Sequence, residues 1–340
     1  MGTIMRRYFS IILIIIMVFA MLPCVAYAET GTDKSGICGD SLTWELSDDG
    51  TLTISGSGPM YDYGIGALPP WWNNIISVTS VVIEDGVTNI GDYAFYGCDF
   101  TNIAIPNSIK TIGKNAFADN PDLTRIIFQG DLPALADTLF SEDMTLVAAY
   151  PQSNTTWTEA AQKNYGGTVA WYPIAEDGSL MGTCGDDLTW TFSNYMLTIS
   201  GTGTMTDYSL ENPAPWTALA AEVRDLTIES GVTSIGSYAF AGMYEMGFLS
   251  TSKTAPTLPE TITAIGENAF SGCTSLVRMN FLGDLPTMAD TIFSEDMTIE
   301  LYYADGNATW TEEARKDYGG NVKWYRFDEN RIDLEGSSSE

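Results

Sequence analysis

Short apolar runs recur along the first half of the chain at intervals of 22 and 23 residues, at 81–83, 103–105 and 126–128. After each run comes a turn, then an apolar residue, and five residues later a phenylalanine, which is Phe95, Phe117 or Phe140. Runs rich in β-branched residues favour strands, and a period in the low twenties is typical of one short unit stacked on itself. We therefore expect a β-rich solenoid with a parallel sheet on one face and stacked phenylalanines behind it.

The whole unit occurs twice. The word CGDSLTW at residue 38 returns as CGDDLTW at residue 184, and the word Ile-Gly-x-x-Ala-Phe occurs twice in each half, ending at Phe95, Phe117, Phe240 and Phe270. We predict two tandem modules at 36–173 and 183–327, a linker at 174–182 and a disordered polar tail at 328–340. An insertion at 243–256 puts the continuity of the second sheet in doubt.

Both modules have ends that differ from the repeat. Two alternating runs, 42–46 and 51–55, flank a Ser-Asp-Asp-Gly turn, and this arrangement predicts a β-hairpin at the N-terminal end. At the other end Thr158 precedes Glu159, which favours a helix that stops at Gly166-Gly167, and a last apolar run follows. We expect a hairpin cap and a helix-plus-strand cap, because terminal repeats need polar closure.

The first 28 residues predict export. Arg6 and Arg7 precede an apolar run at 11–22, and Ala26-Tyr27-Ala28 is typical of a signal-peptide cleavage site. An uncleaved membrane anchor is the alternative. We expect cleavage after Ala28, no membrane contact afterwards, and a secreted, extracellular protein that is either free or associated with the cell surface.

Charge and residue types exclude several function classes. The formal net charge is −29, and loss of the two N-terminal arginines makes it two units more negative, so nucleic acid is not an expected partner. The chain has no histidine, which removes the commonest general base and zinc ligand. The acids Glu142 and Asp143 are too few to hold calcium. We predict no enzyme activity, no metal and no cofactor.

Four cysteines follow the predicted cleavage site: Cys38, Cys98, Cys184 and Cys273. An even number in an exported chain suggests disulfides. However, Cys98 aligns with Met243 and Cys273 aligns with Asn120, so no pairing has the same geometry in both modules. Free, buried thiols are therefore expected.

The segment 105–117, Ile-Pro-Asn-Ser-Ile-Lys-Thr-Ile-Gly-Lys-Asn-Ala-Phe, closely resembles the BspA-type leucine-rich repeat. The entry word CGDxLTW and the exit word Tyr-Gly-Gly-x-Val-x-Trp-Tyr resemble the flanking segments of bacterial cell-surface proteins with such repeats. The resemblance implies two leucine-rich-repeat modules on a secreted or cell-surface protein. It implies a non-catalytic role in adhesion or protein binding.

The outward side of the repeat strands is the candidate ligand-binding surface. Its residues are Val82, Asn102, Arg125, Ile127, Arg224, Thr227, Arg278 and Asn280. Arg125 and Arg278 occupy one equivalent position, and arginine is enriched at binding hot spots. The alternative is that both only neutralise nearby acids. The expected partner is a protein or another macromolecule of a host or cell surface, bound by a monomer.

A second hypothesis is carbohydrate binding by aromatic residues of the end loops, since flat rings suit sugar faces. The candidates are Tyr61, Tyr63, Trp72 and Tyr208. Trp71 and Trp216 recur at one offset, which favours core packing for those two. Trp72 has Thr217 as its counterpart, so it is the better exposed candidate.

Overall fold

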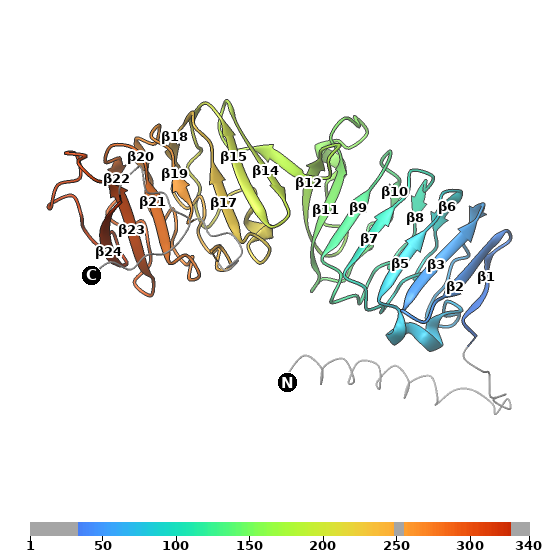
Figure 1. Cartoon of the computed structure of the whole chain (residues 1–340). Helices are drawn as coiled ribbons and strands as arrows, with labels where there is room; N and C mark the ends of the chain where they lie inside the picture. Colours follow the sequence, from blue (N-terminus) through green and yellow to red (C-terminus); the bar gives the residue numbers. More distant parts are fainter. Residues whose placement is uncertain (1–32, 248–254, 328–340) are drawn as a thin grey trace.

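The computed structural model describes residues 33–247 and 255–327, and nearly all regular structure in these ranges is β-strand. Three short 3-10 helices are the only helical elements there, and no helix among these residues is long and apolar enough to cross a membrane. Figure 1 shows two successive arrays of strands, one from each half of the chain. The predicted signal peptide and tail lie outside the described residues.

The broad face of the first module consists of strands that the short apolar runs form. β3 (Thr51–Gly56) pairs in parallel with β5 (Ser80–Ile83), and β7, β9, β11 and β12 form a parallel ladder beside them (Figure 1). The ladder strands are β7 Asn102–Ile105, β9 Arg125–Phe128, β11 Thr145–Pro151 and β12 Thr168–Ile174. Alternate residues are buried, which is the period of a half-buried strand.

A second, narrow sheet lies on the other side of each repeat. Its strands pair in parallel in the order β10-β8-β6-β4, and the two middle strands, β6 and β8, end at the Ile of the repeated word. They are β4 Gly58–Pro59, β6 Val87–Ile90, β8 Thr111–Ile112 and β10 Ala134–Leu135. Each repeat thus gives one strand to each sheet, and its apolar side chains are enclosed between them.

The second module repeats this plan. Its broad-face strands are β15 Met196–Gly201, β17 Asp225–Ile228, β19 Thr257–Leu258, β21 Arg278–Phe281, β23 Thr298–Ala304 and β24 Asn321–Phe327. Its narrow strands are β16 Gly203–Thr204, β18 Val232–Ile235, β20 Ala264–Ile265 and β22 Thr287–Met288. The parallel, repeat-type β architecture that the apolar runs predicted is confirmed.

The predicted aromatic core is also confirmed. Phe95 stacks on Phe117 at 5.8 Å between ring centroids, Phe117 stacks on Phe140 at 6.3 Å, and Trp71 closes the column on Phe95 at 5.9 Å. All four side chains are buried. An equivalent column in the second module contains Trp216, Phe240, Phe270 and Phe293. These columns are continuous through successive repeats, so each ring is covered by its neighbours.

The repeated word has a fixed backbone shape. Its fourth residue adopts a left-handed conformation in all four copies, with φ of 54° at Tyr93, 53° at Asn115, 53° at Tyr238 and 54° at Asn268. Asparagine tolerates this region better than most residues. The turn directs the following alanine and phenylalanine inward, where both are fully buried.

Both predicted hairpins are present, and a third strand precedes each. β1 (Ser35–Gly39) pairs antiparallel with β2 (Leu42–Leu46), and β13 (Leu180–Thr183) pairs in the same way with β14 (Leu188–Ser193). Gly36 lies over the indole of Trp44, where a Cβ would be 2.8 Å from Nε1. A glycine lies opposite each repeated tryptophan, and this feature of the sequence could have predicted the two additional strands.

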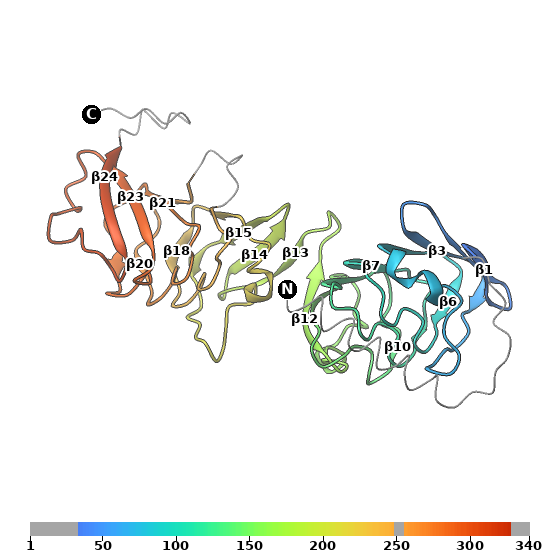
Figure 2. The same cartoon turned by 90° about the horizontal axis from the view of Figure 1, so that it is seen from below.

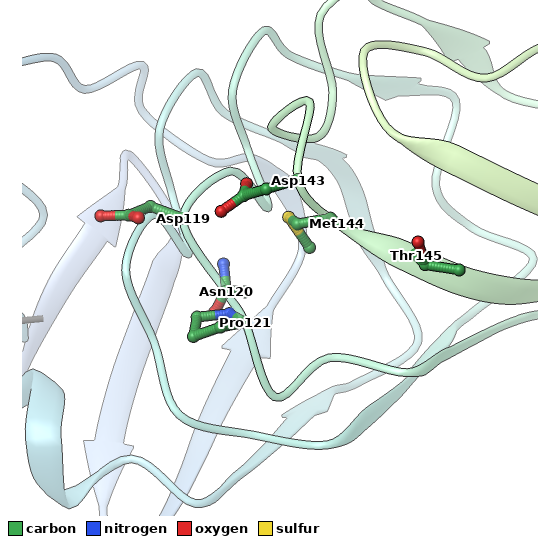
Figure 3. Close-up of a pocket in the computed structure, with 6 residues that line it drawn as sticks. All are labelled: Asp119, Asn120, Pro121, Asp143, Met144 and Thr145. Atoms are coloured by element: carbon green, nitrogen blue, oxygen red, sulfur yellow. The ribbon is translucent and has the colours of Figure 1, made fainter. Parts of the chain in front are cut away.

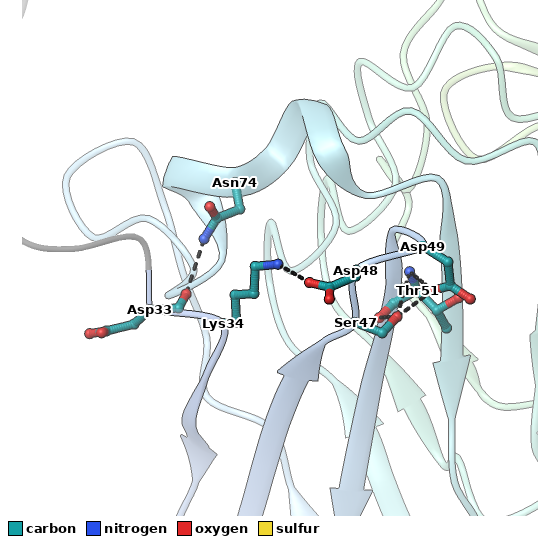
Figure 4. A network of polar contacts seen from close by, with 7 residues as sticks. All are labelled: Asp33, Lys34, Ser47, Asp48, Asp49, Thr51 and Asn74. Atoms are coloured by element: carbon teal, nitrogen blue, oxygen red, sulfur yellow. Dashed lines mark hydrogen bonds and ion pairs between the residues drawn. The ribbon is translucent and has the colours of Figure 1, made fainter.

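Polar contacts hold the first of these ends together (Figure 4). The Asn74 side-chain amide donates to the Asp33 carbonyl at 3.1 Å, and Lys34 pairs with Asp48 in the hairpin turn. The Asp49 carboxylate accepts the Thr51 backbone N–H at 3.2 Å. This turn chemistry fixes the register of the β2–β3 hairpin.

The predicted helix in the C-terminal cap is wrong. Only a three-residue 3-10 turn, η2 (Glu159–Ala161), forms in the first module, and Thr158 makes no side-chain capping bond. Nucleating a helix is costly in so short a segment, and aromatic side chains anchor a different path. The indole of Trp157 donates to the Gly130 carbonyl at 2.9 Å, and that of Trp171 donates to the Lys163 carbonyl at 2.9 Å. The predicted last strands are present as β12 and β24.

The insertion does not by itself explain the interruption of the second broad face. β17 and β19 belong to different hydrogen-bonded sheets, but so do β5 and β7 in the module without an insertion. β19 keeps only two residues where β7 has four. Residues 248–254 of the insertion lie outside the described part of the chain.

The two modules share one sheet. An eight-stranded sheet runs from β7 through β12, β13 and β14 to β17 (Figure 2). β12 meets β13 at a single residue pair, Ile174 with Leu180, around a tight turn in which the Ala175 N–H donates to the Ser179 carbonyl at 2.9 Å. The segment predicted as a linker, 174–182, therefore contains strand residues at both ends.

Side chains reinforce this junction. Val147 and Ala149 point out of the first module and are buried in the core cluster of the second, with exposed fractions of 3% and 0%. The ring of Tyr172 packs edge-on against Trp190 at 5.4 Å, and its hydroxyl donates to the Pro215 carbonyl. The described modules therefore meet through an apolar contact with directed polar bonds at its margin.

Removal of one ring from the first aromatic column tests the core. Phe117→Ala should lower the free energy of unfolding by about 3–5 kcal/mol, because Phe95 and Phe140 each lose a stacked neighbour and cannot close the gap. Urea denaturation would measure this, with Phe270→Ala as the matched change in the second module. If Phe117→Ala melted within a couple of degrees of wild type, the assignment of the core would be wrong.

The cysteines give a second test. All four described cysteines are free and buried, as the sequence predicted, and burial raises the pKa of Cys38 to about 11 and the pKa values of Cys184 and Cys273 to about 12. A protonated, inaccessible thiol is a poor nucleophile. Ellman titration at pH 8 of the chain without residues 1–28 should find almost no reactive thiol when folded and four when denatured without reductant. Two or fewer would establish a disulfide.

The junction is tested by a double-mutant cycle on Arg125 and Glu222, whose guanidinium and carboxylate make two hydrogen bonds of 2.9 and 2.8 Å across it. Arg125→Gln and Glu222→Gln should show a coupling energy of about 1 kcal/mol that falls in high salt. As the control, Arg278→Gln with Glu222→Gln should be additive. Additivity within about 0.3 kcal/mol for Arg125 would show that the pair does not couple the modules.

Candidate functional site

The outward side chains of the broad face fall into two groups according to their surroundings. Val82 on β5 and Asn102 on β7 are exposed, as the sequence predicted for a free surface. Arg125 and Ile127 on β9 are half-buried, because the neighbouring strands and the second module together cover part of each side chain. The broad face of the first module is therefore open at its start and covered at its end.

Arg125 and Ile127 belong to the module junction. Both oxygens of the Glu222 carboxylate accept hydrogen bonds from one nitrogen of the Arg125 guanidinium, Nη2, so Arg125 is paired within the chain. Ile127 packs against the core cluster that contains Val147, Ala149 and Tyr172. The sequence could not show this, because Glu222 lies 97 residues from Arg125.

The equivalent surface of the second module is open and differently built. Arg278 donates to Glu300 at 3.0 Å and lies over the ring of Tyr302, 4.7 Å from its centroid. Tyr302 in turn stacks on Tyr325 at 5.1 Å. Partial burial raises the pKa of Tyr302, and Arg278 opposes that shift. The neutral hydroxyl donates to Glu300 at 3.1 Å.

Three further predicted residues lie on the same side of the second module. Asn280 donates to the Thr257 hydroxyl at 3.2 Å, and Thr227 is exposed with its hydroxyl 3.2 Å from the Met196 sulfur. The guanidinium carbon of Arg224 lies over the Tyr195 ring, 4.6 Å from its centroid. The structure therefore places Arg224, Thr227, Arg278 and Asn280 on one module face, and sequence reasoning missed Glu300, Tyr302, Lys323 and Tyr325 beside them.

The end-loop aromatics do not form one open platform. Tyr63 and Tyr208 pack edge-on against the buried Trp71 and Trp216, at 5.8 and 5.9 Å. Trp72, which begins η1 (Trp72–Ser77), is half-buried and stacks on Tyr96 at 6.2 Å. Tyr61 is exposed, and its hydroxyl donates to Asp40 at 2.9 Å. The packing interpretation of Trp71 and Trp216 is confirmed, since both are fully buried.

One small cavity, of about 80 Å³, lies beside the first aromatic column and is lined by Asp119, Asn120, Pro121, Asp143, Met144 and Thr145 (Figure 3). The buried Asn120 amide donates to the carbonyls of Phe95 at 2.7 Å and Phe117 at 2.8 Å. This asparagine ties adjacent turns together where Cys273 stands in the second module. Among the described residues, no group of three or more acids or cysteines is placed to hold a metal ion.

Comparison with known proteins identifies the repeats. The family described as BspA type Leucine rich repeat region matches residues 71–164 and 243–314, in six copies. These ranges contain three of the four copies of the repeated word, those that end at Phe95, Phe117 and Phe270. No curated protein matches the chain significantly.

Several solved structures are similar over most of their length. A leucine-rich repeat protein from Eubacterium ventriosum is 18% identical with a TM-score of 0.33, over 86% of this chain and 84% of that one. The pneumococcal vaccine antigen PcpA is 12% identical with a TM-score of 0.27, over 88% and 95%. A leucine-rich cell surface protein from Faecalibacterium prausnitzii is 14% identical with a TM-score of 0.23, over 85% and 94%. These scores are too low to establish a common overall arrangement.

The repeat match and the sequence pattern agree. The segment 105–117, whose sequence predicted the family, lies within the first matched range, and the described residues of both ranges form parallel strands in two sheets. The chain therefore contains BspA-type leucine-rich repeats in both modules.

Proposed function

We propose that this protein is a secreted or cell-surface scaffold that binds another protein through its broad face and takes part in adhesion without catalysis. The observation that carries the proposal is the open surface of the second module, where Arg278, the half-buried Tyr302 and Tyr325 form one stack whose two ends, Arg278 and Tyr325, are exposed. Tyrosine and arginine are the residues that most often dominate protein–protein binding energy. The proposed architecture is a solenoid of two capped modules that holds this surface rigid.

The chemistry of the described residues supports a binding role over catalysis. Burial raises the pKa of the four described cysteines, and the chain has no histidine. Its negative charge favours solubility outside the cell and disfavours nucleic acid as a partner. The signal-like segment at 1–28 supports an extracellular location.

Carbohydrate binding by the end loops has less support. Tyr63 and Tyr208 are used to cap the aromatic columns, and one face of Trp72 is taken by Tyr96. The exposed ring that remains is Tyr61. A sugar site needs an accessible flat face with polar groups around it, and the end loop provides little of this.

Parallel binding assays on arrays of purified extracellular proteins and of glycans would test the proposal. We expect a protein partner whose binding is lost in a variant that combines Val82→Arg, Asn102→Arg, Thr227→Arg and Arg278→Glu, because these changes spread over the open broad face. Thr88→Arg, on the narrow sheet, is the matched control and should bind normally. All these positions are surface positions, so melting should shift little.

The opposite pattern would contradict the proposal. If the chain binds only glycans, and if Trp72→Ala abolishes that binding while the broad-face variant keeps it, the end loop is the site.

A further inference from the structure

The duplication places six outward side chains at the same strand register in both modules. We call each set of six side chains a grid. The first grid, in the first module, consists of Arg125, Ile127, Val147, Ala149, Ala170 and Tyr172. In the second module, the register pairs Arg278 with Glu300 and Lys323, and Asn280 with Tyr302 and Tyr325. The two grids therefore share a backbone scaffold and differ only in their side chains.

The first grid has a known occupant, which is the turn of the second module that includes η3 (Thr217–Leu219). This turn offers two polar contacts: the Glu222 carboxylate accepts from Arg125, and the Pro215 carbonyl accepts from the Tyr172 hydroxyl. The turn packs against the small side chains of Val147 and Ala149, which are both buried. The grid thus binds an acidic turn of protein backbone.

The second grid keeps the two residues that make these polar contacts. Arg278 stands in the place of Arg125, and Tyr325 stands in the place of Tyr172. No turn of the described chain covers them: the Arg278 side chain is 49% exposed, and Tyr325 is 40% exposed. The anchors for a carboxylate and a carbonyl are present, and their occupant is absent from the described fold.

A second copy of this chain does not fit as the occupant. Its first module would have to present the end turn that contains η1, and that turn carries Ser77 where the docked turn carries Glu222. Glu300 and Tyr302 also replace Val147 and Ala149, so the second grid has larger and more polar side chains at these two positions. We therefore consider a different protein, and not a second copy of this chain, as the occupant of the second grid.

We propose that the second grid is a docking site for an acidic turn of another protein, which places a carboxylate on Arg278 and a backbone carbonyl on the Tyr325 hydroxyl. The proposal rests on the protein-binding function proposed above and names the site and the partner's chemistry. Lys323 lies next to Glu300 in the register and adds a second cation toward the same carboxylate. The stacked rings of Tyr302 and Tyr325 supply the rigid apolar contact.

Glu300 has a defined part in this site. It holds Arg278 when no partner is bound, as the 3.0 Å hydrogen bond shows, and an incoming carboxylate must displace it. Val147 stands at this position in the first module, where Arg125 is free to pair with Glu222. Loss of the Glu300 charge should therefore strengthen the binding of an acidic turn, whereas loss of the Arg278 charge should weaken it.

The test uses the chain without residues 1–28 and a synthetic peptide with the sequence of residues 212–223, the turn that occupies the first grid. NMR titration should show shifts at β21, β23 and β24. The same peptide with Glu222→Gln should bind at least about fivefold more weakly, since a charged hydrogen bond is lost. Arg278→Gln and Tyr325→Phe in the protein should weaken binding, Glu300→Gln should tighten it, and Lys110→Gln, in the residue before β8 of the narrow sheet, should leave it unchanged.

Three results would overturn the inference: no shift at millimolar peptide, equal binding of both peptides, or full binding by Arg278→Gln. These outcomes differ from a failure of the proposed function. If a protein partner found on the array is lost in the four-residue broad-face variant but retained by Arg278→Gln and Tyr325→Phe, protein binding stands and this site is wrong. If no protein partner binds the chain at all, the proposed function itself fails.

Discussion

The stacking of one repeat on the next is the contact on which the rest of this structure depends. A unit of about twenty residues cannot bury its own apolar face, so Phe117 is covered only because Phe95 and Phe140 lie on either side of it. The first phenylalanine of each column has no preceding repeat to cover it, and Trp71 and Trp216 cover it instead. Sheets, turns and outward side chains take their positions from this column.

The features that could be predicted from the sequence are those that recur along it. The word ending at Phe117 occurs four times, and each occurrence carries its inward residues and its left-handed turn, so strands, core and family could be derived without coordinates. The helix after Thr158 was predicted from capping residues that are sound locally. The helix prediction was wrong because Trp157 and Trp171 hold that segment by tertiary contacts that cannot be predicted from the local sequence.

The candidate site was predictable only in part, for a related reason. Arg125 and Arg278 look alike in the sequence. Only the fold shows that Arg125 is hydrogen-bonded to Glu222, whereas Arg278 is exposed to solvent. A signal did exist in the differences between the copies. Val147 and Ala149 are small and apolar, whereas Glu300 and Tyr302 are not, and such a divergence at outward positions marks a covered surface in one copy and an open one in the other.

The junction also has a mechanical meaning. β12 and β13 join at a single residue pair, whereas β11 and β12 are paired over seven residues, so resistance to separation is very uneven along the chain. A pulling force applied to the two ends of an anchored protein would load that one pair together with the Arg125–Glu222 contact. Under tension, the chain should lengthen first by opening between the modules, while each aromatic column stays intact and the covered end of the first module's outward face becomes exposed.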